Sequence, residues 1–430
     1  MRVLVIGGGG REHALAWRLG SSPRVSQLYV APGNAGTALV AQNLDIAADD
    51  VPGLARAAAE LKVDLVVVGP EVPLAAGIVD VLQGRGVPAF GPVARAAEIE
   101  SSKAFAKELM QRYGIPCARS QSFTSLDEAM AYVNDHPLPI VVKADGLAAG
   151  KGSVVAQTRE EARQALRQMM AERVFGDAGD CVVVEEYLEG VEVSLLAFTD
   201  GQAVVPMVPA CDYKRALDGD RGPNTGGMGS YSPPRFFGDA LTAEVTDHIV
   251  RPTVAAMAAE GRPYRGVLYA GLMLTAEGPR AMEFNARFGD PETQVMLPRL
   301  ESDLVEVMLA VLDGGLSRVP VEWSPRPCVG VVMASGGYPG GYRKGLPIEG
   351  LDEVDGDVLV FHAGTREAGG GVVTDGGRVL TVVASGETMA QAREKAYANV
   401  ARIHFEGCHY RRDIALREVE AGDIAPNTGV

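Results

Sequence analysis

Short apolar runs alternate with Ala- and Leu-rich stretches through the first hundred residues of the chain. The runs predict β-strands at Val3–Ile6, Gln27–Val30, Asp64–Val68 and Pro88–Phe90, with helices between them. Strands that alternate with helices form βαβ units and a parallel sheet. We therefore expect residues 1–100 to form an N-terminal Rossmann-like domain.

The pattern changes from Pro139 onward, where strands are predicted to pair with near neighbours. Ile140–Lys143 and Ser153–Ala156 flank a glycine-rich loop and are expected to form an antiparallel hairpin. Antiparallel signals indicate an α+β fold for a central domain at residues 101–325, with a mobile lid subdomain at about 120–190. A smaller C-terminal α+β domain is expected at 326–430.

Several finer features are predicted from turn-forming residues. Residues 211–234 are rich in Gly, Pro, Asn and charge and predict a long irregular loop, which is usually functional in a compact domain. Val329–Met333 predicts a strand, Asp375–Gly377 a hairpin turn, and Met389–Val400 a helix.

Composition and charge argue against several classes of function. Forty Lys and Arg against 55 Asp and Glu give a net charge of -15, so a polyphosphate backbone is repelled and no nucleic-acid partner is expected. No run of about 18 apolar residues occurs, so no membrane span is expected. The five cysteines form no C-x-x-C pair, which is typical of reduced thiols in a cytoplasmic protein and not of a disulfide frame or zinc site.

The glycine run Gly7–Gly10 follows a predicted strand and precedes a helix. A dinucleotide fingerprint fails at Glu12, and Val30–Asn34 lacks the acidic residue that would bind a ribose. Backbone amides at a helix start can still bind an anion. We therefore predict a phosphate site at Gly9 and Gly10, with a tight structural turn as the alternative.

The stretch Lys143–Gly152 resembles a P-loop but has three residues between its glycines and no Ser or Thr after Lys151. Its glycine tip, which includes Gly150, would instead be a lid loop that closes its amides and Lys151 over a triphosphate. Lys143 would project a charge from the strand into a cleft. Ordinary solvated lysines are the alternative reading.

Two further segments, each with a carboxylate, complete the predicted nucleotide-binding site. Strands at 182–194 surround a short hinge whose backbone could bind adenine, with Glu185 and Glu192 as the nearby carboxylates. Farther along, side-chain alternation places Glu283, Asn285 and Arg287 on one face of a strand. A carboxylate, an amide oxygen and a guanidinium suit a magnesium-phosphate site, whereas a structural Glu283–Arg287 ion pair is the alternative.

Together these motifs resemble the phosphoribosylamine–glycine ligase family of the ATP-grasp superfamily. The resemblance covers essentially the whole chain and is carried, in order, by Gly9–Ala14, Ala31–Thr37, Gly69–Glu71, Lys143–Gly152, Gly222–Gly229, Glu283–Glu292 and Val331–Pro339. The chain departs from the family pattern at Cys211 and Tyr213, where Gln and His are usual, and at Gly8, where Asn occurs.

The resemblance implies a central ATP-grasp domain and a set of site residues. We expect ATP to be bound by Lys103, Lys143, Gly150, Lys151, Glu185, Tyr187, Leu188, Glu192 and Lys214. We expect Mg²⁺ or Mn²⁺ at Glu283 and Asn285, with catalytic roles for Arg287, Lys143 and Asp290. The substrates would be bound by Gly9, Gly10, Glu71 and Asp212.

The implied reaction is ATP-dependent ligation of glycine to 5-phosphoribosylamine in purine biosynthesis, through glycyl phosphate, by a monomer or weak homodimer. A biotin-dependent carboxylase subunit is the alternative within the superfamily. An NAD(P)-dependent oxidoreductase is a further alternative, which the failed fingerprint argues against. A non-catalytic nucleotide-binding regulator is the third alternative. Such a protein can dispense with Glu283, Asn285 and Arg287 together, so the presence of all three argues against it.

Overall fold

Five parallel strands form the N-terminal sheet of the computed structural model, which describes residues 1–147 and 152–423. The strand order is β3-β2-β1-β4-β5, with β1 (Arg2–Gly7), β2 (Gln27–Pro32), β3 (Gln42–Asn43), β4 (Leu65–Val68) and β5 (Ala89–Phe90). Side chains of β1 alternate between two cores, Leu4 and Ile6 in one and Val3 and Val5 in the other. The predicted parallel sheet is confirmed.

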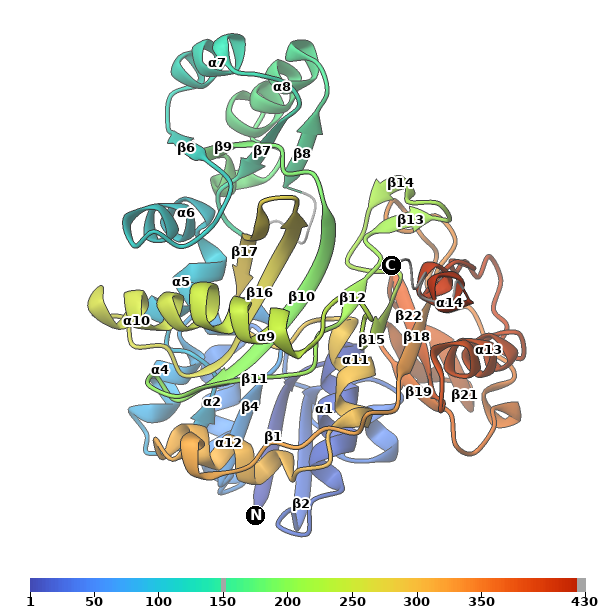
Figure 1. The fold of residues 1–430 in the computed structure, drawn as a ribbon. Helices are drawn as coiled ribbons and strands as arrows, with labels where there is room; N and C mark the ends of the chain where they lie inside the picture. The colour runs from blue at the N-terminus through green and yellow to red at the C-terminus, as the bar shows by residue number, and fades with distance from the viewer. Residues whose placement is uncertain (148–151, 424–430) are drawn as a thin grey trace, which may run out of the picture.

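Helices cover both faces of this sheet (Figure 1). They are α1 (Gly10–Gly20), α2 (Val51–Glu60), α3 (Glu71–Ala75), α4 (Ile78–Gln83) and α5 (Ala94–Ser101), joined by α12 (Leu304–Leu312) from later in the chain. Helices α1 and α12 share a core with Val3, and α2 and α4 share one with Leu4. Burial on both faces explains why Val3–Ile6 of β1 and Leu65–Val68 of β4 are apolar throughout.

A second, small sheet has its own core and lies at the top of Figure 1. Its order is β6-β9-β7-β8, with β6 (Ser120–Phe123), β7 (Ile140–Ala144), β8 (Ser153–Ala156) and β9 (Val182–Glu186). The helices α7 (Leu126–Asp135) and α8 (Arg159–Leu166) contribute to the core, and α6 (Lys103–Arg112) leads into the sheet. The predicted β7–β8 hairpin is confirmed by an antiparallel register that runs from Ile140 opposite Ala156 to Lys143 opposite Ser153.

The central sheet is antiparallel, in the order β11-β10-β16-β17. Its strands are β10 (Val191–Thr199), β11 (Val204–Pro206), β16 (Gly266–Thr275) and β17 (Gly278–Asn285), and nearby helices are α9 (Asp239–Val245), α10 (Arg251–Ala259) and α11 (Glu292–Met296). Strand β9 of the small sheet is followed directly by β10 of this sheet. Residues 187–190 therefore connect two different sheets.

The C-terminal sheet combines strands from two distant parts of the chain, in the order β12-β15-β18-β22-β19. Its strands are β12 (Cys211–Asp212), β15 (Gly229–Ser232), β18 (Cys328–Ala334), β19 (Leu359–His362) and β22 (Arg378–Ser385). Helix α13 (Met389–Val400) has the predicted bounds and packs on β18 and β22, while α14 (Leu416–Asp423) follows. Residues from the middle of the chain thus complete the sheet of the C-terminal part.

Two local predictions were wrong. Residues 211–234 are not an irregular loop, because β12 and β15 join the C-terminal sheet and β13 (Arg215–Leu217) pairs with β14 (Arg221–Asn224). The turn at 375–377 does not close a hairpin either. Strand β21 (Gly371–Thr374) pairs with β20 (Thr365–Ala368), whereas β22 pairs with β18 and β19. The strands β15 and β22 both pair with β18, which is distant from β15 and β22 in sequence.

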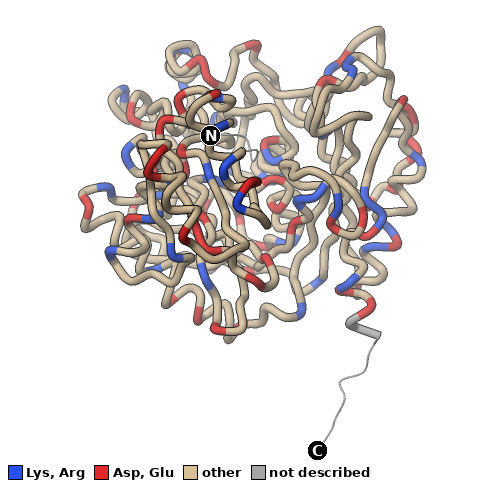
Figure 2. The backbone as a smooth tube through the Cα atoms, turned by 90° about the horizontal axis from the view of Figure 1, so that it is seen from above, with Lys and Arg blue, Asp and Glu red and all other residues tan. Residues whose placement is uncertain are grey.

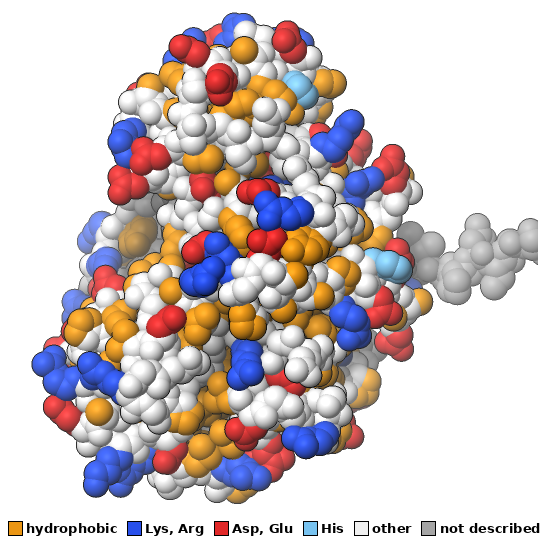
Figure 3. All heavy atoms as spheres, turned by 90° about the vertical axis from the view of Figure 1, so that its left-hand side faces the viewer, with side chains coloured by type: hydrophobic (Ala, Val, Ile, Leu, Met, Phe, Trp, Pro, Cys, Tyr) orange, Lys and Arg blue, Asp and Glu red, His pale blue; other side chains and the backbone are white. Residues whose placement is uncertain are grey.

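Charged residues of both signs are distributed along the chain (Figure 2). Figure 3 shows acidic, basic and hydrophobic side chains interspersed on the face that forms the left of Figure 1. In the described part of the chain, no helix combines the length and the apolar character needed to cross a membrane. The groups that could bind an anionic ligand therefore have to be sought in a specific cleft.

Candidate active site

A cleft of about 1340 Å³ lies between the small sheet, the central sheet and the C-terminal sheet. Most of the predicted site residues line it, namely Glu71, Lys103, Lys143, Glu185, Tyr187, Leu188, Glu192, Asp212, Lys214, Glu283, Asn285, Arg287 and Asp290. Gly9 and Gly10 lie outside this lining. Gly150 and Lys151 lie outside the described residues. The cleft therefore brings together side chains that are far apart in the sequence.

Two lysines share the carboxylate of Glu185. Strands β7 and β9 place Lys143 and Glu185 on the same face of the small sheet, and Lys143 Nζ lies 2.9 Å from Glu185 Oε1. Lys107, one helical turn after Lys103 on α6, lies 3.0 Å from Glu185 Oε2. Burial acts to lower the pKa of Lys143, but Glu185 and Glu283 raise it above its usual value. Two ammonium groups against one carboxylate leave a local positive charge for a phosphate.

Lys103 lies at the start of α6, beside the loop of the β7–β8 hairpin. Ser102 caps the helix by accepting a hydrogen bond from the Phe105 backbone, and Lys103 Nζ donates to Gly146 O at 2.7 Å. Asp145 in the same loop accepts from the Ala104 backbone at 3.1 Å. These contacts attach the start of the loop to α6 and direct a second cationic side chain into the cleft.

The hinge between β9 and β10 supplies Tyr187 and Leu188 to the cleft wall. At the start of β10, Glu192 lies 3.6 Å from Lys214. Asp212 and Glu192 raise the pKa of Lys214 well above its usual value, so this lysine carries a positive charge. The wall therefore combines an apolar and backbone surface with a charged pair, as a nucleoside would require.

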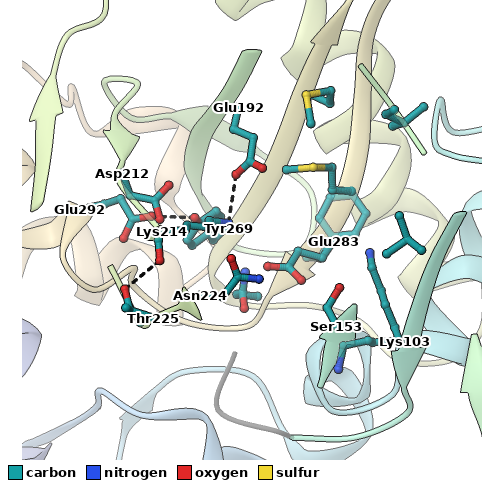
Figure 4. A pocket seen from close by; sticks show the side chains of 18 of the residues that line it. Lys103, Ser153, Glu192, Asp212, Lys214, Asn224, Thr225, Tyr269, Glu283 and Glu292 are labelled. Atoms are coloured by element: carbon teal, nitrogen blue, oxygen red, sulfur yellow. Dashed lines mark hydrogen bonds and ion pairs between the residues drawn. The ribbon is translucent and has the colours of Figure 1, made fainter. Parts of the chain in front are cut away.

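Polar groups cluster on the floor of the cleft (Figure 4). Glu292 on α11 accepts a hydrogen bond from the Tyr269 hydroxyl at 2.6 Å and from the Ser194 hydroxyl at 3.2 Å. Asp212 lies beside this cluster, and its pKa is raised to about 7 because burial and Glu292 outweigh the attraction of Lys214. The cluster has more carboxylates than cations, which suits a ligand that carries an ammonium group.

Strand β17 carries the predicted magnesium-phosphate row. Gly271 of β16 lies opposite Glu283, and the next residue, Leu272, lies opposite Ala281, so Met282 is an extra residue in a β-bulge. The bulge directs Glu283 into the cleft. Asn285 ends the strand, and Arg287 lies two residues beyond it, with its NH2 nitrogen 3.3 Å from Asn285 Oδ1. The three side chains meet as predicted, although Arg287 is outside the strand.

Glu283 and Asn285 fit a hard divalent cation. Burial acts to raise the pKa of Glu283, but Lys214, Lys143 and Lys103 hold it below its usual value, so the carboxylate is ionised. Among the described residues, no side chain donates a hydrogen bond to it. Mg²⁺ typically takes one or two protein oxygens and completes its shell with phosphates and water. The described residues contain no set of three His, Cys, Asp or Glu that could form a complete protein cage.

Arginines connect this row to the N- and C-terminal parts of the chain. Arg287 Nε lies 3.3 Å from Glu71 Oε2, and its NH2 nitrogen lies 2.9 Å from Glu100 Oε1. Asp290, three residues later, lies 3.2 Å from the NH1 nitrogen of Arg378 on β22. Burial acts to raise the pKa of Asp290, but Arg378 and Arg11 hold it below its usual value.

The N-terminal glycine loop is partly filled by its own helix. Glu12 folds back and its Oε2 accepts a hydrogen bond from the Gly9 amide at 2.7 Å, while Oε1 accepts from Arg11 Nε at 2.5 Å. The acidic residue that breaks the dinucleotide fingerprint is therefore a helix cap. Arg11, and not Gly9 or Gly10, is the member of this segment that lines the cleft.

Charged side chains of the cleft that the sequence did not assign to the site include Lys107, Glu100, Glu292 and Arg378. Helical spacing could have indicated Lys107, because it follows Lys103 by four residues. Glu292 lies inside a family-like motif, but its role depends on Tyr269 and Ser194. No local signal distinguishes Glu100 or Arg378 from other charged residues, since their partners are distant in sequence.

This arrangement, with lysines from two elements, a hinge between two sheets, and a carboxylate and an amide oxygen on one strand, is that of an ATP-grasp enzyme. Residues 101–293 match the ATP-grasp (A) domain of phosphoribosylglycinamide synthetase, residues 1–100 its N domain, and residues 328–417 its C domain. The chain belongs to the phosphoribosylglycinamide synthetase family, as its sequence predicts.

Relatives agree over the whole length. The phosphoribosylamine–glycine ligase of Halalkalibacterium halodurans is 51% identical over 428 residues and covers 100% of both chains. That of Escherichia coli K12 is 51% identical and covers 98% of this chain and 99% of its own. A crystal structure of phosphoribosylamine–glycine ligase from Thermotoga maritima has a TM-score of 0.86 at 36% identity and covers 96% of this chain and 100% of its own.

A more distant likeness concerns the fold alone. Biotin carboxylase from Campylobacter jejuni, solved as a β-γ-ATP complex, has a TM-score of 0.73 at 15% identity, covering 99% of this chain and 96% of its own. The expected combination of a parallel N-terminal sheet, an ATP-grasp domain and a C-terminal α+β domain is confirmed.

Proposed function

We propose that this chain ligates glycine to 5-phosphoribosylamine, with conversion of ATP to ADP and phosphate, as a carbon–nitrogen ligase of purine biosynthesis. Family membership over the whole chain supports the reaction. The observation that carries the residue assignment is the position of Glu283, Asn285 and Arg287 in one cleft with Lys103, Lys143 and Lys214.

The triphosphate would be bound by Lys103, Lys143 and Lys214. Adenine would lie against the hinge residues Tyr187 and Leu188, and Glu192 would accept from the ribose hydroxyls. This assignment follows the layout of the cleft, since Lys103 and Lys143 both interact electrostatically with Glu283. Gly150 and Lys151, which follow β7 in the sequence, would also bind the phosphates.

In the proposed mechanism, a glycine carboxylate oxygen attacks the γ-phosphorus and ADP leaves, which forms glycyl phosphate. The nitrogen of phosphoribosylamine then attacks the carbonyl carbon, phosphate leaves, and the nitrogen loses a proton to form the amide. Arg287 stabilises the transferring phosphoryl group, and Lys143 holds the nucleotide in line. Mg²⁺ at Glu283 and Asn285 would neutralise phosphate charge. No nucleophile from the protein is required, because the substrates supply both.

Glycine and phosphoribosylamine would bind in different parts of the cleft. Glycine would present its ammonium group toward Asp212, beside the polar cluster of Glu292 and Tyr269. Phosphoribosylamine would lie toward the N-terminal domain, near Glu71 and the loop of Gly9 and Gly10. Asp290 would help to orient it through the ion pair with Arg378.

ADP release in the presence of Mg²⁺, ATP and phosphoribosylamine, with and without glycine, tests the function. Glycine-dependent release with formation of the amide is the expected result. Release that depends on bicarbonate and not on glycine would favour the carboxylase alternative. Trapping with hydroxylamine would give glycine hydroxamate from glycyl phosphate, and no hydroxamate during turnover would argue against that intermediate.

The proposal also covers the choice of metal ion, the location in the cell and the oligomeric state. Mn²⁺ should replace Mg²⁺, because the same oxygen ligands bind both cations. The chain should act in the cytoplasm as a monomer or weak homodimer, with no nucleic-acid or membrane partner. Analytical ultracentrifugation across a range of protein concentrations would measure the oligomeric state.

A further inference from the structure

Arg287 is fixed by two carboxylates that come from the N-terminal part of the chain. Its NH2 nitrogen lies 2.9 Å from Glu100 Oε1, at the end of α5, and its Nε lies 3.3 Å from Glu71 Oε2, at the start of α3. The other oxygen of Glu100 accepts a hydrogen bond from the Ala286 amide at 2.7 Å. Glu100 therefore binds both the guanidinium and the backbone that carries it.

The two carboxylates differ in accessibility. The side chain of Glu100 is 7% exposed and that of Glu71 is 27% exposed, while Arg287 itself is 17% exposed. A substrate could reach Glu71 from the cleft, but Glu100 has both oxygens engaged within the protein. Glu100 is thus the permanent partner of Arg287, and Glu71 is the partner that a ligand can take over.

We propose that Glu100 is a positioning residue that orients the Arg287 guanidinium toward the transferring phosphoryl group, and that it retains Arg287 when the amine substrate engages Glu71. This inference rests on the proposed function, in which Arg287 contacts the γ-phosphate. A guanidinium with five donors can adopt many orientations, so fixing two of its nitrogens before ATP binds reduces the cost of ordering it.

The same helix corner also positions a second phosphate ligand. Helix α5 ends at Ser101, Ser102 caps α6, and Lys103 is the first residue of α6. Glu100 therefore connects the orientation of Arg287 to the segment that places Lys103. Burial acts to lower the pKa of Arg287, but Glu100 and Glu71 raise it above its usual value. Burial raises the pKa of Glu100, and the attraction of Arg287 acts in the opposite direction.

A comparison of Glu100→Gln with Glu71→Gln tests the inference. Glu100→Gln keeps an acceptor for the Ala286 amide but removes the charge that holds Arg287. We expect kcat to fall by about 100-fold, as for a small misplacement of a reacting group, with the KM for ATP changed by less than about threefold. Glu71→Gln should mainly raise the KM for phosphoribosylamine. A Glu100→Gln enzyme with kcat within about threefold of the wild type would overturn the proposal.

A double-mutant cycle separates positioning from a general structural role. If Glu100 acts through Arg287, then Glu100→Gln on an Arg287→Lys background should lower kcat by less than about threefold further. Effects that multiply in full would overturn the proposal. Thermal unfolding shows whether the Glu100→Gln protein is folded. If it is not, Glu100→Asp replaces it in the test. The shorter side chain of Asp cannot reach both Arg287 and the Ala286 amide, so the same fall in kcat is expected.

Failure of the proposed function would be recognised separately. In that case the wild-type enzyme would release no glycine-dependent ADP, whereas failure of the positioning role alone leaves wild-type ligation intact.

Discussion

The ammonium of Lys143 and the carboxylate of Glu185 lie 2.9 Å apart, and Lys107 approaches the second oxygen of that carboxylate at 3.0 Å. Glu185 is 3% exposed. The family resemblance implies that Glu185 binds ATP, and in the structure its carboxylate oxygens face two lysines. We therefore propose that Glu185 acts on the nucleotide through the lysines that it holds.

Glu185→Gln should weaken ATP binding and destabilise the protein. The substitution leaves two buried ammonium groups without a counter-charge, and breaking a buried ion pair typically costs about 3–5 kcal/mol. We expect the Kd for ATP to rise at least about tenfold and the melting temperature to fall. Isothermal titration calorimetry with ATP and thermal unfolding would measure the two effects.

Glu186→Gln is the matched control for this substitution. Glu186 is the next residue, and it pairs at 2.8 Å with Arg119, whose side chain is almost fully exposed. An exposed pair contributes only about 0–1 kcal/mol, so this variant should remain close to the wild type. Equal effects of the two variants would contradict a specific role of Glu185, because the loss of any nearby carboxylate would then be sufficient to weaken ATP binding.

Glu283→Gln should abolish ligation and leave the fold intact. The amide cannot provide the negative oxygen that Mg²⁺ requires, although it has nearly the same shape as the carboxylate. We expect kcat to fall by at least about 100-fold, and the Mg²⁺ concentration for half-maximal activity to rise. Glu277→Gln, at the tip of the same β16–β17 hairpin, is the control. Full activity in Glu283→Gln would contradict the metal assignment.

Activity should show an acidic limb that belongs to Asp212. Burial and Glu292 raise the pKa of Asp212 to about 7, so its carboxyl is protonated and neutral below that pH. A neutral carboxyl binds the glycine ammonium weakly, and kcat/KM for glycine should fall by about tenfold per pH unit on the acid side. Asp212→Asn should have low activity with no such limb. A limb that persists in this variant would assign the titration to another group.

Acid should destabilise the contact between the N- and C-terminal parts of the chain. His13 Nδ1 accepts a hydrogen bond from the His362 amide at 2.8 Å. Burial, with a smaller contribution from His362, lowers the pKa of His13 to about 3, and burial lowers that of His362 to about 4. Between pH 6.5 and these values only the unfolded chain takes up the protons. Stability therefore falls with decreasing pH, by about 1.4 kcal/mol per pH unit for each histidine.

His362→Gln tests this prediction by urea unfolding at several pH values from 6.5 to 4.5. The pH dependence of the unfolding free energy should decrease by about 1.4 kcal/mol per pH unit relative to the wild type. His404→Gln, at an exposed position, controls for the loss of a histidine. An unchanged slope in His362→Gln would contradict the assignment.

Local patterns predicted those parts of the site that lie within single elements. Side-chain alternation placed Glu283 and Asn285 together, because both follow the bulge at Met282 and the alternation continues beyond it. The hairpin that carries Lys143 was also predicted, since both of its strands are apolar and close in sequence. The order of motifs indicated the family without any knowledge of contacts.

Contacts between distant segments could not be predicted in the same way. Gly229–Ser232 is short and has no apolar pattern, yet it forms a strand because Cys328–Ala334 offers backbone partners a hundred residues later. Arg378 reaches Asp290 only because its strand joins this sheet. Glu12 breaks the dinucleotide fingerprint in the sequence, but the pattern did not indicate that its side chain folds back onto the Gly9 amide. Such outcomes depend on tertiary geometry.

The chain enters and leaves the small sheet through adjacent strands, because β6 pairs with β9 and the Glu186 amide donates to Arg119 O at 2.9 Å. On the entering side, Pro116 O accepts from the Ala281 amide of β17 at 2.8 Å. The small sheet is therefore attached to the rest of the molecule by two chain segments that lie side by side. Two connections side by side would permit rotation about one axis and resist twisting, so we propose that the small sheet swings over a bound nucleotide while Lys143 stays aligned with the central sheet.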